Sequence, residues 1–436
     1  MKLISRGFTL GHQNTKRTVF AFVLLAFVLR LGTMLALETY SFPTEKARVG
    51  FEMGWIASEI AAGSGFKLGG APTAWMAPLY PFILSLIYRI FAYSSLSSTI
   101  ATLVLQSFIS SLVVIPLYLV GKRLFSWQVG LLAAGLWIVH PASIHTAVLA
   151  IWSTNITAFG IMMIILLAIK VHDNPDQTLF ALALGLVVGL TALSDPVILI
   201  PMPFIALWIF WRSGDQKVRV LKQITIVALL ALLTVVPWTI RNYRAFERIV
   251  PIKATLGVNL WLGNHREDIN QPSAGLNTLE AVYSEDDLAY LASLNEVERD
   301  RVVFGRALEF IRANPAIFVK YTLYRIFLFW RVTVADTGVL LDRALLTLPL
   351  LMGLGLLLSW HHWRDTSWLL LLFITFPVVY YLTHSGYPRF RFPIEGPMLI
   401  MMAYAIQELF QLSTRIRPFS PAGRLLKVRY RRNLEE

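Results

Sequence analysis

Long runs of apolar residues, separated by short basic segments, constrain this 436-residue chain more than any other feature. A helix needs about 20 residues to cross the hydrocarbon core of a bilayer. Only 15% of the residues are charged, against about a quarter in an average soluble protein. The pattern predicts an all-α polytopic membrane protein and argues against a soluble enzyme. The ten runs of suitable length are 17–37, 98–120, 127–147, 153–171, 178–194, 197–212, 219–240, 342–359, 367–383 and 394–412.

Two further apolar stretches, 78–92 and 316–332, could either cross the membrane or lie flat in its interface. Both contain basic side chains, which suit contact with lipid headgroups. If both stretches lie flat, every short basic loop comes to one side, which the positive-inside rule assigns to the cytoplasm. We therefore expect about ten spans, or twelve if both stretches cross, with both chain termini in the cytoplasm.

This topology predicts one membrane domain at residues 1–412 and a basic cytoplasmic tail at 413–436. It leaves two long segments on the outer side, a loop at 38–97 and a helical subdomain at 241–341, together with a short segment at 384–393. The cytoplasmic loops are short, so any chemistry is expected on the outer face.

The net charge of +13 fits basic loops and anionic lipid or phosphate partners better than it fits nucleic acid. The sequence contains no cysteine, which excludes disulfides, thiolate metal sites and cysteine nucleophiles.

Glu52 is the candidate catalytic residue. Glu45, Glu52 and Glu59 are spaced seven apart, so a helix through 45–62 would align them along one side. A solvated helix face explains Glu45 and Glu59 equally well. Glu52 is flanked by apolar residues, and a carboxylate at an apolar boundary is costly unless it has a partner or a role. General-base catalysis is such a role.

The stretch that follows Glu59 is rich in turns and aromatic residues. Pro72 and Pro78 interrupt any continuous helix there. The stretch is either a plain connecting loop or a loop that lines a substrate site through Trp75 and Tyr80.

Four stretches of sequence occur in a suggestive order: FEMGWIASEIAAGSGF with PTAWMAPLYPFILSLIYRIF, PWTIRNYRAFERIVPIKATLGVNLWLGNH, RALEFIRANPAIFVKYTLYRIFLFWR, and SGYPRFRFPIEGP. Together, from about residue 51 to 397, they resemble bacterial membrane glycosyltransferases of the family 39 type, within the GT-C superfamily. That group is related to protein O-mannosyltransferases and to lipid A aminoarabinose transferases. The resemblance implies a GT-C fold in which interfacial helices and outer loops form the active site.

The resemblance also implies an enzyme that moves a sugar from a polyprenyl-phosphate donor to an acceptor hydroxyl, with inversion, on the periplasmic face of a bacterial inner membrane. In such enzymes an acidic residue of the first outer loop lies near the acceptor, and Glu52 matches it here. The implied partners are the donor, an acceptor lipid, glycan or protein, and the bilayer. No cofactor is required, although a divalent metal could be accommodated. The sugar, the acceptor and the oligomeric state stay open.

Basic and amide side chains are the candidates for substrate binding. Arg389 and Arg391 would point the same way in an extended segment and could grip one phosphate, or else anchor the next span to headgroups. Arg241 and Lys253 could add phosphate contacts, with a structural anchor as the alternative for Arg241. Asn259 and Asn264 could shape the pocket or simply belong to a turn.

One departure from the family pattern concerns a second acidic residue after the third or fourth span. Here residues 151–155 read IWSTN, without a carboxylate. Asp195 could compensate, or it could cap a helix that begins with Pro196. No residue set predicts a metal site.

Two further functions compete with sugar transfer: a transporter or flippase of a lipid-linked sugar, and a relative that has lost its activity. Transporters commonly show internal repeats and binding sites at the membrane midplane. This sequence shows no repeat, and its polar residues gather in the outer segments, which favours an enzyme.

Overall fold

The computed structural model describes residues 12–42, 44–265, 285–331, 339–383 and 387–416. The predicted all-α architecture is confirmed. The only strands in the described chain are a two-residue antiparallel pair, β1 (Lys67–Leu68) and β2 (Ala71–Pro72).

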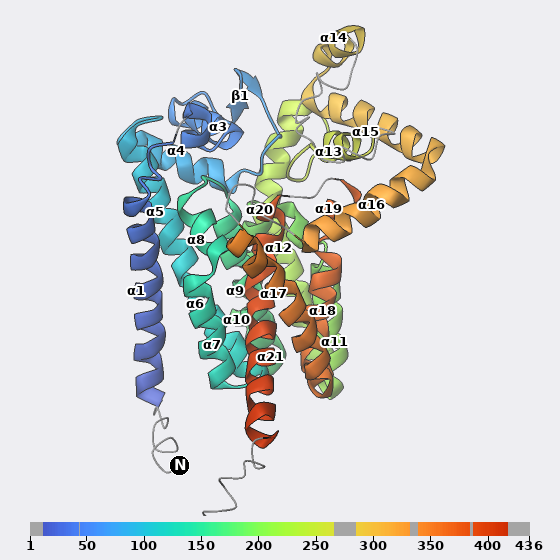
Figure 1. Ribbon diagram of the computed structural model, residues 1–436. Coiled ribbons are helices and arrows are strands. Elements are labelled where there is room, and N and C mark those ends of the chain that lie inside the picture. The colour runs from blue at the N-terminus through green and yellow to red at the C-terminus, as the bar shows by residue number, and fades with distance from the viewer. Residues whose placement is uncertain (1–11, 43, 266–284, 332–338, 384–386, 417–436) are drawn as a thin grey trace, which may run out of the picture.

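Long helices that run along a common axis form a bundle (Figure 1). They are α1 (His12–Ala36), α5 (Leu96–Leu112), α6 (Val114–Leu124), α7 (Trp127–Val139), α9 (Thr154–Asp173), α10 (Thr178–Ala192), α11 (Met202–Arg212), α12 (Lys217–Phe246), α17 (Val339–Leu358), α18 (Trp363–Thr375) and α21 (Glu395–Ile416).

Shorter elements gather at one end of this bundle, which we call the cap end (Figure 1). They are α2 (Glu45–Val49), α3 (Glu52–Ala61), the β1–β2 pair, α4 (Leu79–Phe91), α13 (Leu256–Gly263), α14 (Glu285–Ser293), α15 (Glu296–Ala313), α16 (Pro315–Trp330) and α20 (Pro388–Arg391). The three segments predicted to lie outside the membrane therefore come together in space. The N-terminal end of α1 and the C-terminal end of α21 lie at the opposite end of the bundle.

Five helical stretches of the described chain are long and apolar enough to cross a membrane, and a sixth qualifies if the bent pair α7 and α8 (Pro141–Val148) is one span. The chain is therefore a multi-pass membrane protein. Fewer stretches qualify than the ten spans predicted, because several predicted spans form shorter helices. The segment at 178–194, for example, forms the 15-residue helix α10.

The two ambiguous stretches become α4 and α16, which have 13 and 16 residues. At 1.5 Å per residue, neither reaches the roughly 30 Å of a hydrocarbon core. Both lie at the cap end, and both run across or oblique to the bundle axis (Figure 1).

The single helix expected over 45–62 is wrong. The chain breaks between α2 and α3, where Gly50 and Phe51 have φ values of 82° and 58°. Both angles lie in a region that right-handed helices do not use. Because of this break, Glu52 is the first residue of α3 rather than a member of a continuous stripe.

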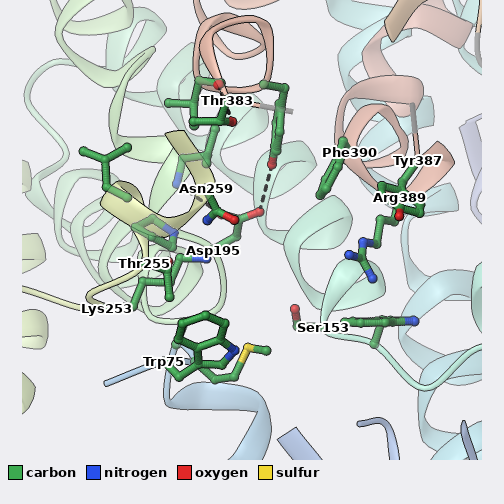
Figure 2. A pocket seen from close by; sticks show the side chains of 18 of the residues that line it. Trp75, Ser153, Asp195, Lys253, Thr255, Asn259, Thr383, Tyr387, Arg389 and Phe390 are labelled. Carbon is green, nitrogen blue, oxygen red and sulfur yellow. Dashed lines mark hydrogen bonds between the residues drawn. The ribbon is translucent and has the colours of Figure 1, made fainter. Parts of the chain in front are cut away.

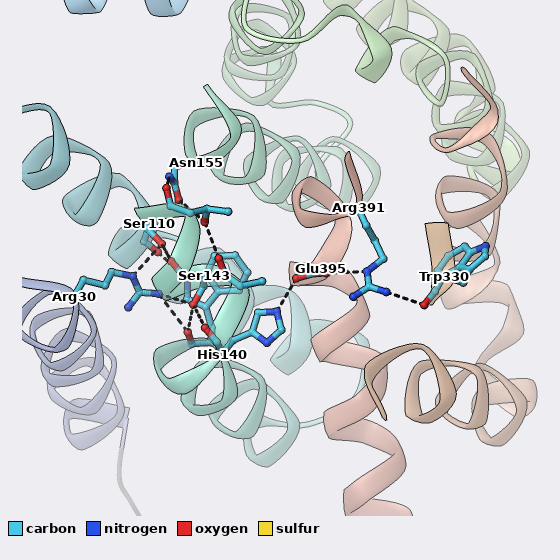
Figure 3. Close-up of polar contacts among 11 residues, drawn as sticks. Arg30, Ser110, His140, Ser143, Asn155, Trp330, Arg391 and Glu395 are labelled. Atoms are coloured by element: carbon cyan, nitrogen blue, oxygen red, sulfur yellow. Dashed lines mark hydrogen bonds and ion pairs between the residues drawn. The ribbon is translucent and has the colours of Figure 1, made fainter. Parts of the chain in front are cut away.

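A second break lies at His140 and Pro141, where α7 and α8 are bent by 48° relative to each other. A residue before proline is disfavoured in the helical region, and His140 has ψ of 120°. The buried guanidinium of Arg30 in α1 donates hydrogen bonds to Trp137 O (3.3 Å), Ser143 Oγ (2.9 Å) and Ser110 Oγ (3.0 Å) (Figure 3). A cation is favourable at the carbonyl end of a helix, so Arg30 stabilises the broken span.

Candidate active site

A cavity of about 720 Å³ opens at the cap end. Small-molecule sites usually enclose about 300–1,000 Å³. The walls come from all three segments predicted to lie outside the membrane and from the cap-side ends of bundle helices. Its polar and aromatic lining consists of Lys46, Phe51, Glu52, Trp75, Trp152, Ser153, Thr154, Ser194, Asp195, Lys253, Thr255, Asn259, His265, Tyr321, Tyr380, Thr383, Tyr387, Arg389 and Phe390.

Glu52 lines this cavity from the first turn of α3. A carboxylate is a favourable side chain in the first turn of a helix, where the backbone N–H groups carry partial positive charge. Its side chain is partly buried, and no described residue donates a hydrogen bond to it. The carboxylate is thus available to a ligand in the cavity.

Arg389 faces the same cavity from α20. Its guanidinium carbon lies 4.1 Å from the ring centroid of Trp152, 5.0 Å from that of Tyr387 and 5.2 Å from that of Phe390. Burial lowers the pKa of Arg389, while the nearby charges of Tyr387, Tyr380 and Glu52 favour its charged form. An arginine is effectively always protonated, so the cavity keeps a positive charge that interacts electrostatically with Glu52.

Trp75, Lys253, Thr255 and Asn259 form the opposite wall (Figure 2). The loop that carries Trp75 is fixed by Glu296, which accepts hydrogen bonds from Thr73 Oγ1 (2.6 Å) and from the backbone N–H of Ala74 (2.8 Å).

The backbone N–H of Ala254, next to Lys253, donates to Ala74 O (2.9 Å). This bond joins the segment of Lys253 to the loop of Trp75, so the two parts of the wall are held in register.

Asp195 lies between the two walls (Figure 2). It caps the short helix η1 (Pro196–Leu199) by accepting from the N–H of Val197 at 3.2 Å, as a residue before a first-turn proline commonly does. The Tyr380 hydroxyl donates to its other oxygen at 3.4 Å. Asp195 therefore has a structural role and also contributes negative charge to the cavity.

Arg391 does not line the cavity. The extended segment expected around Arg389 and Arg391 is wrong, because these residues form the helical turn α20. Side chains two apart in a helix point in different directions. Arg391 is fully buried, forms an ion pair with Glu395 (2.8 Å) and donates to Trp330 O (2.8 Å), and Glu395 contacts His140 at 2.6 Å (Figure 3).

Three further predicted site residues lie behind the cavity wall. Arg241 donates to the carbonyls of Thr73 (2.6 Å) and Phe66 and stacks on Trp238 at 4.9 Å. Tyr80 donates to Gln106 Oε1 at 2.7 Å, and Asn264 accepts from the buried Arg325 at 2.7 Å. These contacts support the walls rather than present groups to the cavity.

Sequence reasoning missed Trp152 and Lys46, both of which line the cavity. Trp152 lies in the stretch that was singled out only for its missing carboxylate. Neither residue belongs to a spacing pattern, so a single sequence carries little signal for them.

The described residues hold no group of three or more His, Cys, Asp or Glu side chains that could bind a metal ion. Glu52, Asp195 and His265 all line the cavity. Asp195 is already engaged by Val197 and Tyr380, and the Glu52 carboxylate faces the charge of Arg389. In the described structure these three side chains do not form a metal-binding group.

No protein-family model matches the sequence, and no curated protein matches it. Solved structures do share its fold. The archaeal oligosaccharyltransferase AglB from Archaeoglobus fulgidus, in complex with an inhibitory peptide and a dolichol-phosphate, matches with a TM-score of 0.58 at 15% identity, over 94% of this chain and 52% of that one.

Two other structures of the Archaeoglobus fulgidus oligosaccharyltransferase match with TM-scores of 0.56 at 16% identity. The complex with Zn and sulfate is matched over 90% of this chain and 49% of that one. The form tethered to an acceptor peptide containing the NVT sequon is matched over 93% and 51%. The chain thus has the GT-C fold of these oligosaccharyltransferases and spans about half of their length.

Proposed function

We propose that the protein is a membrane glycosyltransferase that transfers a sugar from a polyprenyl-phosphate donor to an acceptor hydroxyl, with inversion at the anomeric carbon. The observation that carries this proposal is the pairing of Glu52 and Arg389 in one cavity of suitable size at the cap end of a membrane bundle. The GT-C fold supports it, since the similar structures are glycosyltransferases that were solved with a dolichol-phosphate or an acceptor peptide.

The reaction needs a base for the acceptor and a cation for the leaving phosphate. In our proposal the Glu52 carboxylate takes the proton of the acceptor hydroxyl as its oxygen attacks the anomeric carbon. The bond between that carbon and the donor phosphate oxygen breaks at the same time, and the phosphate leaves with the electron pair. Arg389 binds the phosphate, and the proton held by Glu52 passes to solvent or to the released phosphate.

The opposite wall provides the sugar and acceptor contacts in this proposal. An indole ring, an amide and a hydroxyl, supplied by Trp75, Asn259 and Thr255, suit a polar ligand with apolar faces. Lys253 adds a second positive charge that can contact phosphate. No step of this scheme passes through a metal ion.

The remaining predicted residues act as supports in this scheme. Arg391 fixes α20, and thereby Arg389, through its ion pair with Glu395. Arg241 and Asn264 secure the loops that carry the opposite wall, and Tyr80 holds Gln106.

The finer assignment follows the family 39 resemblance and the positive-inside pattern. We place the protein in a bacterial inner membrane with the cap end in the periplasm. The acceptor classes remain a lipid, a glycan or a protein hydroxyl, and the 413–436 tail is assigned to the cytoplasm; of that tail, the structure describes only 413–416.

The test compares purified native protein with Glu52→Gln in a transfer assay that supplies labelled polyprenyl-phosphate sugars and a membrane extract with native acceptors. Glutamine keeps the size of the side chain but cannot act as the base. We expect transfer to fall by about 100-fold or more.

Glu59→Gln is the matched control. Glu59 lies on the same helix but does not line the cavity, so its variant should transfer at the native rate. Unchanged transfer by Glu52→Gln would remove Glu52 from the chemistry. Native protein that binds donor but never transfers sugar would instead favour a flippase or an inactive relative.

A further inference from the structure

Trp152 differs from the other cavity residues because it contacts both Arg389 and Phe51, the neighbour of Glu52. One side faces the guanidinium of Arg389, with 4.1 Å between the guanidinium carbon and the ring centroid. Phe51, the residue before Glu52, stacks on the indole with centroids 5.1 Å apart and planes 25° from parallel. A segment at 151–154 therefore joins the loop of Glu52 to the turn of Arg389.

The backbone of Trp152 is fixed by a hydrogen bond to the buried side chain of Gln106. The backbone N–H of Trp152 donates to Gln106 Oε1 (3.1 Å), and the amide of the buried Gln106 donates to the carbonyls of Ala147 (3.2 Å) and Ala150 (2.9 Å). Tyr80 donates to the same Gln106 oxygen at 2.7 Å. Moving the Trp152 backbone would break its bond to Gln106, whose side chain the other three bonds hold in place, and a hydrogen bond to a buried group is expensive to leave unmade.

The loop of Glu52 closes against the same segment. A side chain at Gly50 would come within 2.6 Å of the Ile151 side chain and 2.9 Å of its carbonyl oxygen. Lys46 places its ammonium 5.3 Å from the centroid of the Phe51 ring. Lys46, Phe51, Trp152 and Arg389 thus form a series of ring contacts along the cavity wall, which we call the stack.

Among the described residues, the stack leaves the N–H donors of Arg389 without a hydrogen-bond acceptor. The faces of aromatic rings attract the charge of a guanidinium, and its five N–H donors lie in its own plane. Within the described parts of the chain, no acceptor takes a hydrogen bond from Arg389. Figure 2 shows its side chain pointing from the turn of Tyr387 and Phe390 towards Ser153, into the cavity. An in-plane edge presented to a cavity is the geometry for bidentate contact with a phosphate.

We propose that Trp152 is a positioning residue that fixes the guanidinium plane of Arg389 so that its free edge binds the donor phosphate. Through Phe51, the same ring holds the start of α3 and therefore sets the separation between the phosphate ligand and Glu52. This inference rests on the proposed function, because it assigns the anion at Arg389 to the phosphate of a polyprenyl-phosphate donor.

The experiment measures the dissociation constant of a labelled polyprenyl phosphate, without sugar, for the purified full-length protein in detergent. We expect Arg389→Gln to weaken binding more than any other single variant while leaving a dissociation constant that can still be measured at high ligand concentration. Trp152→Ala should weaken binding about tenfold, since a desolvated cation–π contact is worth that much. Trp152→Phe keeps an aromatic face and should stay within about threefold of the native value.

A double variant separates positioning from general packing. If Trp152 acts through Arg389, adding Trp152→Ala to Arg389→Gln should cause no further loss. Equal losses in both backgrounds would overturn the inference, and so would native-like binding by Trp152→Ala. Trp360→Ala is the control, because Trp360 is 75% exposed and lies outside the cavity. Trp152→Leu replaces the alanine variant if thermal unfolding shows that the latter is not folded.

The outcomes also separate this inference from the proposed function. Native protein that binds no polyprenyl phosphate would contradict both. Native protein that binds, with Arg389→Gln losing affinity and Trp152→Ala keeping it, would contradict the role of Trp152 alone.

Discussion

Gly50 determines where helix α3 begins, and therefore where the carboxylate of Glu52 lies. Its φ of 82° lies in the left-handed region, which costs a residue with a side chain about 1–2 kcal/mol. The close approach of Ile151 at the same position leaves no room for a Cβ atom. The break between α2 and α3, and hence the placement of Glu52 at a helix N-terminus, depends on this one residue.

We therefore expect Gly50→Ala to destabilise the protein by about 3 kcal/mol or more, the sum of backbone strain and overpacking. It should also reduce transfer, because relief of the clash moves Glu52 or Trp152. Thermal unfolding and the transfer assay measure the two effects.

Gly63→Ala is the matched control for this prediction. Gly63 has a similar φ of 84° but nothing within 4 Å of an added Cβ, so it should show the strain alone. Equal destabilisation by the two variants would mean that the contact with Ile151 is not limiting.

Among single residues, the sequence located Glu52, Arg389, Trp75, Lys253 and Asn259, all of which line the cavity. They could be proposed because sugar transfer from a phosphate carrier needs a base, cations and polar or aromatic contacts, and these residues supply such groups. The position of Arg391 depended on α20 being a helical turn, which a four-residue segment between prolines does not reveal. Trp152 depends on contacts with residues about 100 and 240 positions away, which no local pattern encodes.

At the scale of elements, α15 is joined to the wall of the cavity through Glu296. Its carboxylate accepts from Thr73 and Ala74 across more than 220 residues of sequence. Burial raises the pKa of Glu296, and the hydrogen bonds from Thr73 and Ala74 oppose that rise. The contact therefore holds the loop of Trp75 in place, and it leaves the Glu296 carboxylate partly removed from water.

The raised pKa of Glu296 determines how this side chain changes the stability of the folded protein with pH. The folded protein binds the Glu296 proton more readily than the unfolded chain, in which glutamate titrates near pH 4.3. The stabilising contribution is fully present below that value and is lost as pH rises through the native pKa. Glutamine does not titrate, so the stability of Glu296→Gln relative to native protein should rise between about pH 4 and pH 7.

Thermal unfolding of both proteins in detergent across this pH range measures the effect. A stability difference that stays constant with pH, or that moves in favour of the native protein as pH rises, would contradict it.

The existence of most helices could be predicted, but their breaks could not. Apolar length predicted α1, α9 and α12 well, because a long apolar run in a membrane has few alternatives to a helix. Pro141 is a local signal for the break at His140, but the contacts that hold the two breaks, with Ile151 at Gly50 and with Arg30 beside His140, come from residues distant in sequence.

At the scale of the whole molecule, the three outer segments, which include the helices α4 and α16, lie at one end of the bundle (Figure 1). The cavity lies at the same end. The predicted bundle of membrane helices is confirmed as a fold. The number of spans was harder to predict, since helices of 11–15 residues, such as α10 and α11, are apolar but too short to count by length alone.

The orientation of this bundle is open to a direct test, because the chain has no cysteine. Ser64→Cys places a thiol on an exposed cap-end turn, and Asp215→Cys places one in the exposed turn before α12, at the opposite end. If the cap end is periplasmic, an impermeant maleimide added to intact cells should label Ser64→Cys and leave Asp215→Cys unlabelled until the membrane is opened. The reverse pattern would place the cavity on the cytoplasmic side and contradict our assignment.

The central claim is that Glu52 and Arg389 divide the chemistry of sugar transfer between them. The most direct measurement takes donor affinity and single-turnover transfer from the same preparations of native protein, Glu52→Gln and Arg389→Gln. We expect Glu52→Gln to bind donor within about threefold of native protein and to lose transfer by about 100-fold or more, while Arg389→Gln loses donor affinity. Full transfer by Glu52→Gln, or native donor affinity in Arg389→Gln, would contradict the account.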